Sequence, residues 1–397
     1  MQHACTTPKT VIVLARPWRL GVLAFRRARC AILAICIGAL LNWQLLLQHS
    51  ARKEARLNAL GNLRGKLILG LVLGIVVVAA LSIYADFSKM LVVLRDFNWW
   101  LFVPILGFTL FNYGLRFYKW DVYLRIIGAT GVAKKDSLLI FLSGFAMAMT
   151  PGKVGEVLKS YLLKQIHGTP IAVSAPVVMA ERVTDGLAMM VLASVGLVLF
   201  DYGRILLIGI GIAAIVFLFV FQNRAVAERL LLWGERLPII SKTVHHLRVF
   251  YDSSYELFRL RNLLFGIIIG IISWSGEVLA FVLVMMGLGV PFSWLLVIIC
   301  SFILAASTLI GSVTLLPGGL GTADASIAGM LIFLFPAYLQ VPMPQDTAVA
   351  ATLLIRFATL WFGVGIGLIG LTMMQRRLGR LDLDRVEEER VMALAER

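Results

Sequence analysis

The sequence predicts an all-α protein, a polytopic transmembrane helical bundle of about seven to nine helices. Of its 397 residues, 60% are hydrophobic and only 15% are charged, whereas a soluble domain is nearer one quarter charged. Apolar stretches recur at about the 20-residue length that crosses a bilayer. Two of these apolar regions are interrupted by proline and glycine, at 151–156 and at 317–321. We expect both interruptions to be re-entrant or broken helical hairpins.

The first 61 residues are predicted to be a basic extension outside the membrane domain. Residues 1–29 are rich in arginine and contain no acid, which is typical of a targeting peptide or of a wrongly assigned start codon. Residues 30–47 are apolar but have basic flanks on both sides, so they either form one extra helix or lie on the membrane surface. The transmembrane domain is then 62–376, and 377–397 is a charged cytoplasmic tail.

The first half of the domain contains two spans and a short hairpin. Spans are expected at 67–85 and 99–117, joined by a short loop at 86–98. The basic segment 116–136 is expected in the cytoplasm. The apolar stretches 137–150 and 154–165 are too short to cross and flank the break at 151–156, which predicts a hairpin entered from the cytoplasm.

The second half repeats this plan from the other side. Between 287 and 355 there is no lysine or arginine, so the break at 317–321 is expected on the outer side of the membrane. It lies between two short apolar arms, as the first break does, and the pair is compatible with an origin as inverted repeats. The remaining expected segments are spans at 171–200, 205–221, 263–286 and 347–374, a cytoplasmic amphipathic loop at 222–262, and a cytoplasmic C-terminus.

The two breaks are expected to form one binding site. A helix that begins after such a turn directs free N–H groups and its positive dipole end at the gap, and both attract anions. Lys153 adds a full positive charge, and intramembrane ionisable residues are functional candidates by default. The expected headgroup path consists of Pro151, Gly152, Lys153, Gly155, Glu156, Glu181, Arg182, Asp185, Pro317, Gly318, Gly319, Gly321 and Asp324.

Structural interpretations of the same residues remain open. A Pro-Gly break is also the pattern of a helix kink or a turn between helices. Glu181, Arg182 and Asp185 could form a buried structural ion pair, because positions i and i+3 share a helix face. Glu277 and Arg356 are lone intramembrane charges that need partners, either each other or the charges at the breaks. Lys159 is expected near the lipid headgroups.

Other chemistry finds no support in the sequence. Cys5, Cys30, Cys36 and Cys300 lack the spacing of a metal site or a disulfide framework, and the histidines are not paired at ligand spacing. Nucleotide-binding glycine motifs are absent. We therefore expect no metal, no cofactor and no nucleic acid partner.

Three motifs in this order resemble the lysylphosphatidylglycerol synthase transmembrane-region family. They are the run at 151–159, the sequence Glu181-Arg182-x-x-Asp185, and the run at 316–321. The family is a flippase-like domain that occurs alone or fused to an aminoacyl-transfer domain. The resemblance covers roughly residues 62–376. It implies a lipid-translocating domain with re-entrant segments, in which Lys153, Glu156, Glu181, Arg182 and Asp185 line the site.

The chain departs from that family pattern at the second break. The family often has an arginine and a glutamate there, where this chain has Ala323 and Asp324, which predicts a weaker cationic contact on the outer side. Residues 377–397 leave no room for the aminoacyl-transfer domain, so we expect no lysyl transfer and no enzyme activity.

The function expected from these features is a lipid translocase in the cytoplasmic (inner) membrane, moving an anionic phospholipid or a polyprenyl-phosphate-linked lipid. Two alternatives stay open. A membrane glycosyltransferase or lipid-modifying enzyme would need carboxylates in sizeable external loops, and the external loops here are short. A non-transporting partner of a lipid-synthesis enzyme would act through the loop at 222–262.

Overall fold

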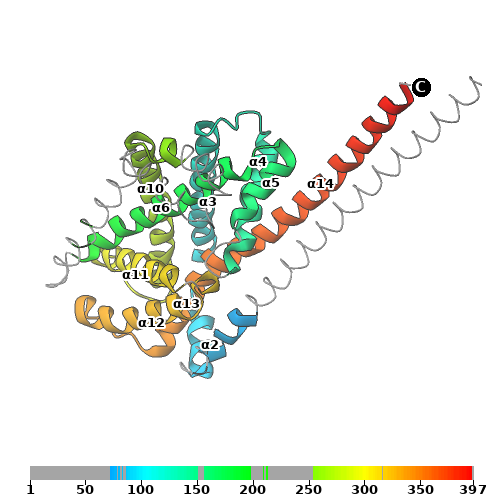
Figure 1. The fold of residues 1–397 in the computed structure, drawn as a ribbon. Coiled ribbons are helices and arrows are strands. Elements are labelled where there is room, and N and C mark those ends of the chain that lie inside the picture. Colours follow the sequence, from blue (N-terminus) through cyan, green and yellow to red (C-terminus); the bar gives the residue numbers. More distant parts are fainter. Residues whose placement is uncertain are drawn as a thin grey trace, which may run out of the picture. The chain divides into compact units, whose positions relative to one another are not determined.

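The computed structural model describes residues 86–150, 156–197, 254–314 and 316–395, with a few positions at 72–77, 79–80, 83, 209 and 212. The described residues form helices and turns and contain no strand (Figure 1). Among the described residues, five helical segments are long and apolar enough to cross a membrane. The predicted all-α, polytopic helical class is confirmed. The predictions for 1–61, for 151–155, for nearly all of the span at 205–221 and for most of the loop at 222–262 fall outside the described residues.

Helix α10, Leu260–Gly287, is one of the most extensively packed helices among the described residues. It packs against helices α3, α6, α11 and α13, and its residues contribute to the largest apolar core. The other helices are α2 Phe87–Asp96, α3 Phe102–Ile126, α4 Lys134–Ala146, α5 Leu158–His167, α6 Ile171–Leu197, α11 Trp294–Val313, α12 Thr322–Leu334, α13 Gln345–Arg356 and α14 Phe362–Ala395. Short turns of other helix types lie between them: η1 Trp99–Leu101, η2 Met147–Met149, η5 Pro317–Gly319, η6 Phe335–Leu339 and η7 Phe357–Trp361.

The first break lies between two short helices that pack against each other, α4 and α5. They contain 13 and 10 residues, which gives lengths of about 20 and 15 Å. Neither reaches the roughly 30 Å of a bilayer core. The arms are therefore as short as the sequence indicates.

The second break lies between α11 and α12, and here the expectation of two short arms is wrong. Helix α11 has 20 residues, which suffice to cross a bilayer. The turn itself needs glycine, because Gly318, Gly319 and Gly321 all have positive φ (61°, 67° and 81°), a conformation that glycine adopts without the steric penalty other residues face.

Two further segment boundaries differ from the sequence-based expectation. Residues 86–98 are not a loop, because Asp86 caps the amide of Ser88 and starts helix α2. The second span does not end at residue 117. Helix α3 continues to Ile126, so Arg116 and Lys119 lie inside the bundle and not in a cytoplasmic loop.

The last expected span, 347–374, is two helices and a π-turn. Helix α13 ends at Arg356, the π-turn η7 follows, and α14 then runs to Ala395. Thr359 lies within this π-turn, and its backbone carbonyl accepts a hydrogen bond from the hydroxyl of Tyr113 at 2.7 Å. π-turns inside helices are frequent at functional sites.

Glycines allow α14 to approach α4 at backbone distance. A Cβ built at Gly367 would lie 2.7 Å from the carbonyl carbon of Phe145 and closer still to the amide nitrogen of Ala146. A Cβ built at Gly365 would meet nothing within 4 Å. This contact fixes the end of α4 just before the first break.

Gly367→Ala is expected to destabilise the protein by about 1–3 kcal/mol, because the added methyl must separate two backbones. The matched control Gly365→Ala is expected to be neutral or slightly stabilising, because alanine is the better helix former by about 1 kcal/mol. The measurement is the apparent melting temperature of each purified variant in detergent. Equal shifts for the two variants would contradict the close α4–α14 contact.

Candidate functional site

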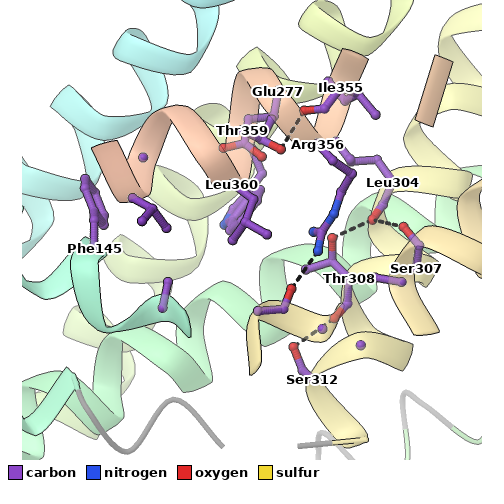
Figure 2. A pocket seen from close by; sticks show the side chains of 18 of the residues that line it. Phe145, Glu277, Leu304, Ser307, Thr308, Ser312, Ile355, Arg356, Thr359 and Leu360 are labelled. Carbon is purple, nitrogen blue, oxygen red and sulfur yellow. Dashed lines mark hydrogen bonds between the residues drawn. The ribbon is translucent and has the colours of Figure 1, made fainter. Parts of the chain in front are cut away.

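A partly open cavity of about 140 Å³ connects the two breaks. Around the first break, Phe145, Ala148 and Glu156 line it; around the second, Gly318 and Gly319 do. The turns η2 and η5 touch each other beside the cavity. The remaining wall comes from α3, α6, α10, α11, α12, α13, η7 and α14 (Figure 2). The described parts of both breaks therefore meet at one place, as the sequence predicts.

The cavity wall is charged although the surrounding helices are apolar. Arg116, Arg182 and Arg356 line it together with Glu156 and Glu277. Hydroxyl groups of Ser307, Thr308 and Ser312 on α11 face it as well. Such a lining suits an anionic, hydrogen-bonding guest rather than an apolar one.

Behind the cavity wall, one carboxylate lies within ion-pair distance of three cationic side chains. Asp185 of α6 accepts a hydrogen bond from the Lys119 ammonium at 2.5 Å. It also lies 3.7 Å from the Nε of Arg116 and 3.7 Å from a guanidinium nitrogen of Arg182. The Lys119 side chain is completely buried. Buried charges persist only when paired and hydrogen-bonded, so Asp185 is the anchor of this cluster.

Helix α5 and the turn just before it are joined to α6 by two further ion pairs. The ammonium of Lys159 on α5 pairs with Glu181 and lies 4.6 Å from the ring centre of Trp120, a favourable cation–π distance. Glu156 lies 3.0 Å from Arg182. Lys159 is 3% exposed, so its expected position among lipid headgroups is wrong.

The second break is fixed by Arg356, which reaches it from the end of α13. Its Nε donates to Asp324 at 2.7 Å, and another guanidinium nitrogen donates to the carbonyl of Gly318 at 2.7 Å. The second oxygen of Asp324 accepts from the amide of Gly321 at 2.8 Å. Arg356 therefore pairs with the acid at the second break, Asp324, and not with Glu277.

This network also revises the outer-side expectation. Ala323 does not supply the arginine that the related family often has there, but Arg356 brings a guanidinium to the same turn from a different helix. The cationic contact at the second break is therefore present.

Arg116 is the cavity cation with the fewest direct partners. The central carbon of its guanidinium lies 5.4 Å from the ring centre of Phe145 and 5.6 Å from that of Trp274. Its buried Nε has no hydrogen-bond acceptor among the described residues, and neither has the indole Nε1 of Trp274. Two buried donors beside a cavity are a favourable place for an anionic acceptor, because unsatisfied buried donors are costly.

Sequence reasoning did not select Arg116 and Lys119, although a signal for them exists. Asn112, Arg116, Lys119 and Tyr123 follow the spacing i, i+4, i+7 and i+11, so they share one helix face. All four are buried. A polar face on a membrane helix indicates contact with other protein segments.

The predicted path residues have the following positions. Glu156, Arg182, Gly318 and Gly319 line the cavity. Glu181, Asp185, Pro317, Gly321 and Asp324 lie in the contacts behind it or in the turn that bounds it. Pro151, Gly152, Lys153 and Gly155 fall outside the described residues. No group of three or more metal-binding side chains is gathered in the described part of the chain.

Residues 67–367 match the family described as the lysylphosphatidylglycerol synthase TM region. Three relatives from Methanothermobacter thermautotrophicus, each called a UPF0104 membrane protein, are also similar. One is 26% identical over 319 residues, which are 75% of this chain and 90% of the relative. The second is 28% identical over 277 residues, 63% of this chain and 78% of the relative. The third is 25% identical over 280 residues, 63% and 77%.

The family match spans the two breaks, all the described charged residues around the cavity, and the helices that hold them. Together with the five helices able to cross a membrane, it shows a multi-pass membrane protein. The chain belongs to the family of the lysylphosphatidylglycerol synthase transmembrane region.

Proposed function

We propose that the protein is a lipid translocase that moves an anionic lipid, a phospholipid or a polyprenyl-phosphate-linked lipid, across the cytoplasmic membrane. The observation that carries the proposal is the charged cavity that described residues of both helix breaks line. Its arginines would bind the phosphate of the headgroup, while the acyl chains stay in the lipid. The family's name refers to a phospholipid, lysylphosphatidylglycerol, which supports a lipid as the substrate class.

The geometry supports a role for Arg116 in holding the headgroup. Its guanidinium lies near two aromatic rings, and its buried Nε donates no hydrogen bond to a described residue, although Asp185 lies 3.7 Å away. A phosphate oxygen would accept a charge-assisted hydrogen bond there, and the neighbouring Trp274 indole offers a second donor. Glu156 and Arg182, which also form part of the wall, would orient the headgroup from the side of the first break.

The test is the movement of fluorescently labelled phosphatidylglycerol and labelled polyprenyl phosphate between leaflets of liposomes that contain the purified protein. Arg116→Gln is expected to slow the movement about tenfold, because one charge-assisted hydrogen bond contributes about 1.5 kcal/mol or more. The control Arg125→Gln changes the same residue type on the same helix, at a side chain that is 56% exposed, and should move lipid as the unmodified protein does.

Movement no faster than in protein-free vesicles, for both lipids, would contradict the proposal. Mass spectrometry of the same vesicles separates it from the enzyme alternative, because lipid modification would produce a new lipid species and transport would not.

A further inference from the structure

Glu277 differs from every other acid around the cavity. It lies on helix α10, is 4% exposed and lines the cavity wall (Figure 2). Glu156, Glu181, Asp185 and Asp324 each contact a cation. Within the described part of the chain, the Glu277 carboxyl forms neither a hydrogen bond nor an ion pair. A buried carboxylate without a partner is costly and readily becomes protonated.

The groups that face Glu277 explain why it has no partner of its own. Tyr113 and Arg116 of α3, Asp185 of α6 and Arg356 of α13 act on it electrostatically. The Tyr113 hydroxyl donates to Thr359, and Arg356 is engaged by Asp324 and Gly318. Helix α11 presents serine and threonine hydroxyls, and η1 carries no ionisable side chain. Arg116 is thus a nearby cation whose buried Nε can still donate a hydrogen bond.

A charge count shows what the protonation state of Glu277 decides. The described cluster at α3, α5, α6 and α10 contains the cations Arg116, Lys119, Lys159 and Arg182, and the acids Glu156, Glu181, Asp185 and Glu277. With Glu277 ionised the sum is 4 − 4 = 0; with Glu277 protonated it is 4 − 3 = +1. A net charge buried among apolar helices is unfavourable. A monoanion beside Arg116 would restore neutrality in the protonated state only.

We propose that Glu277 is a proton-binding site linked to anion binding: it takes up one proton when a phosphodiester or phosphate monoanion binds at Arg116, and releases it when the anion leaves. This inference rests on the proposed function, because it concerns the same cavity. It adds that a proton binds together with the anionic substrate. No covalent bond changes, and the proton comes from and returns to water. Binding would be electroneutral, and a pH difference across the membrane could drive the movement of the anion.

The test is calorimetric binding to the full-length protein in detergent, over about pH 5 to 9. The probes are dimethyl phosphate, which stays a monoanion over this range, and the short-chain lipid dihexanoyl phosphatidylglycerol. Measurement in two buffers of different ionisation enthalpy gives the number of protons taken up. We expect about one proton per bound probe where Glu277 is ionised in the free protein, and an affinity that falls about tenfold per pH unit there.

Glu277→Gln mimics the protonated side chain at the same size. It is expected to bind the probe without proton uptake, with an affinity that no longer depends on pH and equals that of the unmodified protein at low pH. The control Glu256→Gln changes an exposed acid outside the cavity and should keep the full pH dependence. Proton uptake by the unmodified protein is a second readout that needs no variant.

Proton-linked binding of dimethyl phosphate would support the proposal and show that a free phosphodiester suffices. Proton-linked binding of the short-chain lipid, without binding of dimethyl phosphate, would also support it and show that the site takes a headgroup together with its chains. Proton uptake that persists in Glu277→Gln, or failure of both probes to bind, would overturn it. Proton-linked binding without lipid movement in liposomes would leave the Glu277 site standing and reject the translocase. Lipid movement with proton-independent binding would do the reverse.

Discussion

Asp185→Ala is expected to lower the stability of the protein by about 3–5 kcal/mol, the usual effect of removing one partner of a buried ion pair. Asp185 is the carboxylate closest to Lys119, whose side chain is completely buried, and it also balances Arg116 and Arg182. Without it, three neighbouring cations would repel one another in a region of low dielectric constant. The measurement is the apparent melting temperature in detergent and the yield of monodisperse protein.

The double variant Lys119→Met with Asp185→Ala tests the cause of that loss. If the unpaired charge is responsible, the double variant should be more stable than Asp185→Ala alone, because the buried ammonium has been removed as well. Glu256→Ala serves as the control. Its pair with Arg259 is exposed on both sides and is expected to contribute less than about 1 kcal/mol. If the loss of stability in the double variant equals the sum of the losses in Asp185→Ala and Lys119→Met measured singly, Asp185 contributes mainly by packing.

The sequence is sufficient to locate the two breaks, and described residues from both of them line one cavity; that this cavity is a binding site stays a prediction. Proline and glycine inside apolar segments are visible without a structure, because lipid offers no hydrogen-bond partner to interrupted backbone. The shortness of α4 and α5 can be counted directly. The class of the protein follows from composition and segment length alone.

The charged wall of the cavity could not be predicted in the same way. Counting positive charges assigns cations near the end of a span to the cytoplasm, and so it places Arg116 and Lys119 in a loop after the expected span 99–117, whereas both lie inside α3. Their burial depends on Asp185, 66 residues further on for Lys119. Lys159 is likewise buried only because α5 packs against α6, where Glu181, 22 residues later in the sequence, accepts a hydrogen bond from its ammonium. Pairings between helices require the packing, which hydropathy does not encode.

The ion pair of Arg356 is a second example of a pairing between helices that the sequence alone does not determine. Glu277 and Asp324 were equally acceptable by composition, since both are acids in apolar segments. The packing of α12 against α13 places Asp324 within reach of Arg356, whereas Glu277 has no ion-pair partner in the described residues. Tertiary geometry thus turns two similar carboxyls into a structural one and a candidate functional one.

Arg356→Ala is expected to open the second break. The variant loses both hydrogen bonds of the guanidinium, to Asp324 and to the Gly318 carbonyl, each contributing about 1.5–3 kcal/mol as a charge-assisted bond. It also leaves the Asp324 carboxylate buried without its cation. The amide of Gly321, which donates to Asp324, should exchange its hydrogen roughly 100-fold faster, as expected for a loss of about 3 kcal/mol. Hydrogen exchange followed by mass spectrometry of the peptide that contains 317–321 measures this directly.

Arg356→Lys separates charge from geometry at the same position. A lysine keeps the positive charge, but it lacks the planar fork that bridges Asp324 and Gly318 together. Faster exchange in Arg356→Lys, close to that of Arg356→Ala, would mean that the fork holds the turn closed. Exchange as slow as in the unmodified protein would mean that charge neutralisation of Asp324 is sufficient. The control Arg259→Lys alters an exposed pair and should change nothing at the break. Because the same turn bounds the cavity, the variant that opens it should also alter lipid movement, which links the local hydrogen-bond network to the proposed transport path.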